Sequence, residues 1–178
     1  MILKKTTVLL LGLLLYIGVS YGQTQRFEKI AFILGEWHGT GIGFGNDTSV
    51  ITTSFQLTMD GMYIAVRNDS QFEPTVANPN GEHHIDNGFI SFDKHRNTFV
   101  FRQFNNEGYV NHYILNELLS TELMLVFETE NIENFVPGGK ARWTIKKISA
   151  TQIETIFDVS FPDKNYTCFG TNTLERND

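Results

Sequence analysis

Two stretches near the C-terminus decide the fold: residues 141–146 (ARWTIK) and residues 152–161 (QIETIFDVSF). In the first stretch Ala141, Trp143 and Ile145 alternate with polar side chains, and the second continues this alternation with one apolar exception. Successive side chains of a β-strand point to opposite faces, so a period of two predicts half-buried strands. The connection between them is too short for a crossover helix, so the two strands are expected to pair antiparallel.

The same period continues through most of the chain. With turns such as Asp60-Gly61 between the segments, it predicts about ten strands, at residues 37–44, 49–59, 62–68, 84–92, 99–104, 109–115, 123–129, 141–146, 152–161 and 166–174. The predicted fold class is all-β: a single antiparallel meander β-barrel of about ten strands with a short N-terminal helix. Barrel closure removes exposed strand edges, and a two-sheet sandwich is the alternative.

The short helix is expected at residues 26–34, ahead of the first strand. Apolar residues recur there at helical spacing, and Gly35 ends the segment. The strand that follows carries glycines at positions 39, 41 and 43, so the missing side chains fall on one face. Such a strand can bend sharply or let another element approach closely. A phosphate-binding loop is not expected, because no strand precedes these glycines and no helix follows them.

The first 22 residues have the features of a secretory signal peptide. Two lysines precede an apolar run over residues 8–19, and small residues stand at the cleavage position before Gln23. The run is short for a bilayer-spanning helix. We therefore expect a signal peptide at residues 1–22 and one domain at residues 23–178. The protein is then secreted or periplasmic, with no membrane span after cleavage.

The charge balance excludes some partners. The 178-residue chain has a net charge of −6; without the two leader lysines, 12 basic residues remain against 20 acidic ones, which gives −8. An acidic surface disfavours nucleic acid and anionic membranes. Cys168 is the only cysteine, which rules out an intramolecular disulfide. We expect its side chain to be a small buried hydrophobe, with a reactive thiol or an intermolecular bridge as the alternative. The oligomeric state is left open.

Residues 34–41 (LGEWHGTG) resemble the opening of the calycin superfamily, which includes lipocalins and fatty-acid-binding proteins. The matching pattern is Gly-x-Trp after a short helix. The resemblance implies a barrel in which Trp37 closes one end and packs beneath a basic residue from the last strand. Arg176 lies in the corresponding segment, so Trp37 and Arg176 are expected to form a structural closure through a cation–π contact.

Within that superfamily the glycine run is most similar to nitrobindin-like haem-binding barrels and to uncharacterised bacterial lipocalin-like domains. The haem-binding proteins place an axial histidine near the C-terminus, whereas residues 166–176 contain none. The proline turn expected after Phe44 is also absent. These departures argue against haem, and no cofactor is expected. The final-strand Arg-x-Tyr of fatty-acid-binding proteins is missing as well, which disfavours a fatty-acid carboxylate.

The candidate ligand-binding residues are Tyr63, Phe101, Gln103 and His112. His112 shares a strand face with apolar neighbours, which fits either a hydrogen-bonded core residue or a group that acts inside a cavity. The sequence does not decide whether Gln103 or its neighbour Arg102 lines the interior, and Tyr63 and Arg67 pose the same choice.

No metal site is expected at the adjacent His83 and His84. Glu82 and Asp86 flank this pair, but neighbouring strand residues point to opposite faces, so both imidazoles cannot easily bind one ion. We interpret the segment as a solvated loop. No catalytic motif was found elsewhere.

These observations favour a binding protein over an enzyme. The expected function is an exported lipocalin-like barrel that binds a small hydrophobic or amphipathic molecule in its interior. One alternative is a cavity enzyme, of isomerase or decarboxylase type, with His112 as general base. The other is a packed structural or interaction barrel without a ligand.

Overall fold

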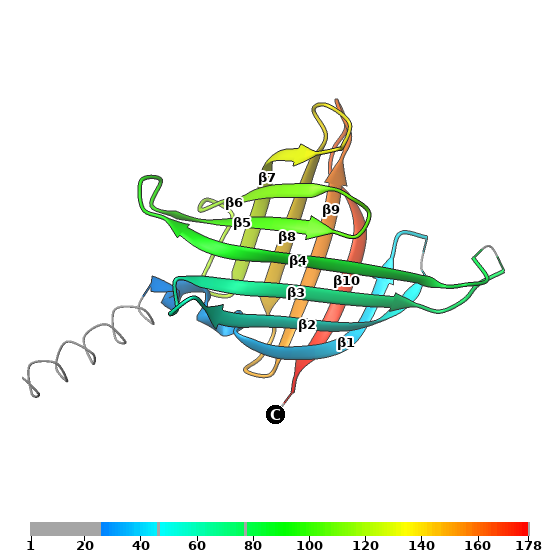
Figure 1. Cartoon of the computed structure of the whole chain (residues 1–178), viewed down its shortest axis with the longest axis horizontal. Helices are drawn as coiled ribbons and strands as arrows, with labels where there is room; N and C mark the ends of the chain where they lie inside the picture. The colour runs from blue at the N-terminus through cyan, green and yellow to red at the C-terminus, as the bar shows by residue number, and fades with distance from the viewer. Residues whose placement is uncertain (1–25, 46, 77, 178) are drawn as a thin grey trace, which may run out of the picture.

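The computed structural model describes residues 26–45, 47–76 and 78–177, and it is a closed antiparallel barrel (Figure 1). Every strand pairs with its neighbour in sequence, and the last pairs with the first. The elements are η1 (Glu28–Ile33), β1 (Gly35–Gly43), β2 (Thr48–Thr58), β3 (Tyr63–Phe72), β4 (Glu82–Asp93), β5 (Thr98–Asn105), β6 (Val110–Leu115), β7 (Met124–Glu133), β8 (Lys140–Lys147), β9 (Gln152–Ser160) and β10 (Thr167–Arg176). The predicted ten-strand meander is thereby confirmed. The expected signal peptide, residues 1–22, lies outside the described residues.

The seam between β1 and β10 closes the barrel and depends on glycine. Trp37 pairs with Arg176 at one end of the seam, and Gly43 pairs with Gly170 at the other. A Cβ on Gly39 would lie 2.0 Å from the backbone oxygen of Thr173, so only glycine permits this approach. The glycines predicted to share one face do allow a close approach of another element.

One end of the barrel is packed with apolar side chains. Phe27, Ile30 and Ile33, from η1 and the residue before it, are fully buried against inward side chains of the strands. Figure 1 shows η1 at the end where β2 turns into β3, opposite the β3–β4 connection. The predicted N-terminal helix is therefore present as a 3-10 helix that plugs this end.

Trp37 and Arg176 fasten the plug to the barrel. The indole nitrogen of Trp37 donates a hydrogen bond to the Ile33 carbonyl at 2.7 Å. The Arg176 guanidinium lies 4.3 Å from the centre of the Trp37 ring and donates to the carbonyls of Phe32, at 3.0 Å, and Leu34. The expected structural closure by this pair is observed.

The opposite end is not filled. It is surrounded by the connections β1–β2, β3–β4, β5–β6, β7–β8 and β9–β10, and a cavity opens among them. None of the helices within residues 26–45, 47–76 and 78–177 is long and apolar enough to cross a membrane.

Replacement of Arg176 by alanine should destabilise the barrel, because it leaves two plug carbonyls without their charged donor and uncovers Trp37. We expect the free energy of unfolding, measured by urea denaturation, to fall by about 2–3 kcal/mol. Arg96→Ala is the matched control, since Arg96 forms only exposed ion pairs with Asp93 and Glu130. Equal losses in the two variants would contradict a closing role for Arg176.

Candidate functional site

The open half of the barrel holds a cavity of about 710 Å³. All ten strands contribute lining residues to it, and its floor includes Tyr113, Ala141 and Trp143 above the packed core. Cavities that bind small molecules typically measure roughly 300–1,000 Å³, so the space suits a molecule of modest size. The two sides of this cavity differ sharply in chemistry.

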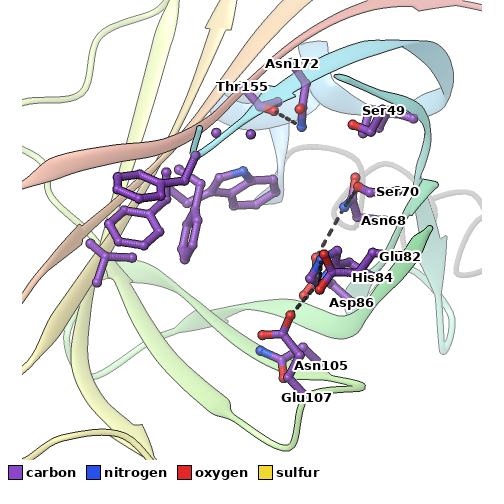
Figure 2. A pocket seen from close by; sticks show the side chains of 18 of the residues that line it. Ser49, Asn68, Ser70, Glu82, His84, Asp86, Asn105, Glu107, Thr155 and Asn172 are labelled. Atoms are coloured by element: carbon purple, nitrogen blue, oxygen red, sulfur yellow. Dashed lines mark hydrogen bonds and ion pairs between the residues drawn. The ribbon is translucent and has the colours of Figure 1, made fainter. Parts of the chain in front are cut away.

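One side is a polar wall built on β2, β3, β4 and β5, and Asn68 is its centre (Figure 2). The Asn68 amide accepts a hydrogen bond from the Thr53 hydroxyl at 2.7 Å. Its nitrogen donates to the Ser70 hydroxyl and to the Asp86 carboxylate, each at 3.2 Å. The wall is therefore a connected network that holds Asp86 with a neutral donor.

His84 lies at the rim of the polar wall, between two carboxylates. Its Nε2 is 3.0 Å from Glu82, and its Nδ1 contacts Glu107. Carboxylate oxygens and imidazole nitrogens are common zinc ligands, and the ligand atoms of the three residues lie within 4.8 Å of one another. However, the two carboxylates contact different ring nitrogens. As arranged, the three side chains form a cluster of ion-pair contacts around the imidazole.

Asp86 is the carboxyl group whose ionisation the cavity disturbs most clearly. Burial raises the pKa of Asp86 from 3.8 to about 6; the Asn68 hydrogen bond opposes this shift, and the charge of Glu107 adds to it. Burial also raises the pKa of the neighbouring Tyr113, and the charge of Asp86 reinforces that effect. Asp86 thus carries a charge at neutral pH in surroundings that, in sum, disfavour its ionised form.

The other side of the cavity is aromatic. A chain of rings follows the mouth: Tyr109 contacts Phe135, Phe135 contacts Phe161, and Phe161 contacts Phe169, at centroid distances of 5.7, 5.6 and 6.4 Å. Phe44 stacks on Phe169 at 4.8 Å. We call these five residues the aromatic arc. Phe44 is 66% exposed, so apolar surface faces solvent at the entrance.

Two glycines of β1 allow close side-chain packing where the polar and aromatic sides meet. A Cβ on Gly41 would lie 2.3 Å from the side-chain oxygen of Asn172, and one on Gly43 would lie 3.1 Å from the Phe72 ring. Asn172 in turn donates a hydrogen bond to Thr155 at 3.1 Å. The glycines of β1 therefore let Asn172 and Phe72 pack closely against this strand.

The four predicted ligand residues are not brought together. Gln103 lines the cavity, where its oxygen accepts a hydrogen bond from Asn111 at 2.8 Å, so the choice between Gln103 and Arg102 is settled for Gln103. Phe101 is fully buried in the packed core, against Trp143 and Tyr113. The other two residues lie on the outer face.

His112 and Tyr63 both point away from the cavity. Along β6 the buried positions are Asn111, Tyr113 and Leu115, so His112 is on the outer face, where it contacts Glu133 at 2.7 Å. Tyr63 packs edge-on against Phe89 outside the barrel. The outer position of His112 removes the geometric basis for a general base acting inside the cavity.

Two local expectations were wrong. His84 is not in a solvated loop: it lies in β4, where the predicted strand over residues 84–92 also placed it, and faces the cavity, whereas His83 faces outward and contacts Asp69, as the predicted alternation requires. Cys168 is exposed rather than buried, because a register shift between Cys168 and Gly170 interrupts the β9–β10 pairing.

The sequence reasoning missed Asn68, Asn105 and Glu107, and it considered Asp86 only as a neighbour of a rejected metal site. The sequence did contain a signal for the cavity wall, because the residues on the inward face change from apolar to polar along a single strand. On β5, Phe99 and Phe101 are followed by Gln103 and Asn105.

No protein-family model matches the sequence, and no curated protein matches it. Among solved structures, the crystal structure of Rv2717c from M. tuberculosis is similar, with a TM-score of 0.63 and 12% identity over 86% of this chain and 98% of that chain. The chain also matches EF1p2_mFAP2b bound to DFHBI, with a TM-score of 0.43 and 14% identity over 82% of this chain and 94% of that chain. A de novo designed fluorescence-activating β-barrel matches with a TM-score of 0.43 and 13% identity over the same shares, 82% and 94%.

The similarity to Rv2717c supports the barrel fold alone. Membership of the calycin superfamily, and of its nitrobindin-like group, stays a prediction.

The raised pKa of Asp86 has a consequence for stability. An acid that holds its proton more tightly in the folded state contributes stability at low pH, and this contribution is lost as the pH rises through about 6. Asp86→Asn should therefore stabilise the protein relative to wild type at pH 7.5, on the order of 1–2 kcal/mol, with the difference shrinking toward pH 4. Urea denaturation between pH 4 and pH 8 measures the difference.

Asp69→Asn provides a control of opposite sign. His83 and Arg67 hold the pKa of Asp69 below its ordinary value, so its charged form stabilises the fold at neutral pH and this contribution is lost in acid. A stability difference between wild type and Asp86→Asn that stays constant with pH would refute the assignment of Asp86 as a buried acid with a raised pKa.

Proposed function

We propose that this protein is an exported binding barrel that holds a small hydrophobic or amphipathic molecule in its open half. The observation that carries the proposal is the cavity of about 710 Å³ with one polar wall and one aromatic wall. A pocket of this size with mainly apolar walls and a few placed polar groups is the usual form of a small-molecule site.

The division of the interior supports binding over a purely structural role. The packed end contains the apolar core, the η1 plug and the Trp37–Arg176 closure. The open end, in contrast, leaves aromatic surface in contact with solvent at Phe44, Phe157 and Phe161. Exposed apolar surface of this kind is costly unless something covers it. A barrel with only a structural function would gain stability from filling this space.

Binding is also favoured over catalysis. The candidate general base His112 lies outside, and the polar groups inside are engaged in hydrogen bonds around Asn68 and in ion-pair contacts around His84. Polar groups held in this way can orient a bound ligand, and they do not need to react with it. Export is part of the proposal and rests on the leader-like residues 1–22 and on the lone cysteine, which fits a protein that holds its fold by its core.

A neutral fluorescent probe tests cavity binding. Nile red should bind the wild-type protein with an increase and blue shift of its emission. Thr155→Trp should weaken this binding by about tenfold or more, because Thr155 lines the cavity and the indole would occupy part of it. Ile156→Trp is the matched control, since the neighbouring side chain points outward from the same strand.

Circular dichroism should show that both variants keep the barrel. No emission change with wild type would contradict a ligand-binding cavity. Equal affinities for wild type and Thr155→Trp would place the bound probe outside the interior and would also reject the proposal.

A further inference from the structure

The charges that line the cavity are almost all of one sign. Among the described residues, the acidic side chains on its wall are Asp47, Glu73, Glu82, Asp86 and Glu107, and no lysine or arginine lines it. Of the lining residues that the structure describes, His84 alone is basic. An ion that enters the cavity therefore meets a negative wall.

The arginines and lysines that pair with acids do so on the outside of the barrel. Arg142 contacts Asp158 from an outward position on β8, and Lys146 contacts Glu154 in the same way. Arg67 likewise contacts Asp69 on the outer face of β3. Within the described residues, the lysines and arginines thus pair with some outer carboxylates and with none of the cavity carboxylates.

Inside, the available partners do not balance the charge. Within the described part of the chain, Asp47, Glu73 and Asp86 take part in no ion pair, and Asp86 receives only the neutral Asn68 amide. Glu82 and Glu107 share a single imidazole, that of His84. Two carboxylates on one ring leave at least one negative charge uncompensated, whatever the protonation of that ring.

The acidic and aromatic groups face each other across the mouth. The acids belong to the β2–β5 side, as the labelled Glu82, Asp86 and Glu107 show in Figure 2, and the aromatic arc belongs mainly to the β6–β10 side. The faces of aromatic rings attract cations as well as apolar groups. Both sides of the mouth therefore favour a positively charged group attached to an apolar body.

We propose that the cavity selects organic cations, namely amphiphiles with a protonated amine that lies against Asp86 and Glu107 and an apolar body that packs on the aromatic arc. The inference rests on the proposed function, because it names the ligand class of the same cavity. It also excludes anionic amphiphiles, whose carboxylate or sulfate would meet uncompensated carboxylates and no fixed cation.

The ionisation of Asp86 is consistent with this selection. The groups that face it are Asn68 from β3, His84 from its own strand, Glu107 from the β5–β6 connection and Tyr113 from β6. Burial and the charge of Glu107 raise the pKa of Asp86, whereas the Asn68 hydrogen bond and the charge of His84 lower it, and the net shift is upward. An ammonium group would supply the missing counter-charge.

Three naphthalene derivatives that share one apolar body separate charge from hydrophobic binding: 1-naphthylmethylamine, 1-naphthalenemethanol and 1-naphthoate. Isothermal titration calorimetry at pH 7.5 and low salt should give the order amine, alcohol, carboxylate. We expect the amine to bind about tenfold more tightly than the alcohol, and the carboxylate to bind most weakly. Added salt should reduce the advantage of the amine.

Charge-neutralising variants assign the effect to residues. Asp86→Asn and Glu107→Gln should each weaken binding of the amine by about fivefold, while the alcohol, which carries no charge, keeps its affinity. Glu133→Gln is the matched control, because it removes the same charge from the outer face beside His112. The unchanged alcohol affinity shows that a variant still folds and still has its cavity.

The outcomes separate this inference from the proposed function. Equal affinities for the three compounds, or an amine affinity that Asp86→Asn and Glu107→Gln leave unchanged, would overturn cation selection while cavity binding stands. Binding of Nile red without binding of the amine would also overturn cation selection and leave cavity binding in place. Failure of Nile red and of all three naphthalene compounds would overturn the proposed function together with the inference.

Discussion

The structure depends on the closure of the sheet between β1 and β10. A ten-stranded meander with unpaired first and last strands would leave two long edges open to pairing with other chains. The single cysteine excludes an internal disulfide, so closure has to come from backbone pairing and packing alone. Gly39 lets the two strands approach, and Arg176 fixes the end of the seam to Trp37 and to the η1 plug.

This closure also divides the interior, because it places the plug at only one end. Inward positions near the plug are apolar, and the same strands become polar or lose their side chains toward the mouth. On β3 the inward series runs from Ile64 and Val66 to Asn68 and Ser70. On β1 it runs from Trp37 to glycines. The inward faces of the same strands therefore form a packed core at one end and line an open cavity at the other.

The fold could be predicted from the sequence because the alternation of apolar and polar residues is a local pattern that recurs in most of the strands. Alternation in residues such as 152–161 specifies a strand without reference to any other segment, and the Gly-x-Trp pattern with Arg176 identified the closure correctly. The site was harder to predict because it needs the register between strands. Nothing local places Asp86 opposite Asn105 of β5, or Glu107 beside His84. Bulges compound the difficulty, as the exposure of Cys168 shows.

The central claim is that the open half of the barrel takes a small molecule between its acidic and aromatic walls. A crystal structure of the protein with 1-naphthylmethylamine tests it most directly. We expect the naphthalene rings against the aromatic arc and the nitrogen within hydrogen-bond distance of Asp86 or Glu107. An interior filled by side chains, or the compound bound only on the outer face, would contradict the account.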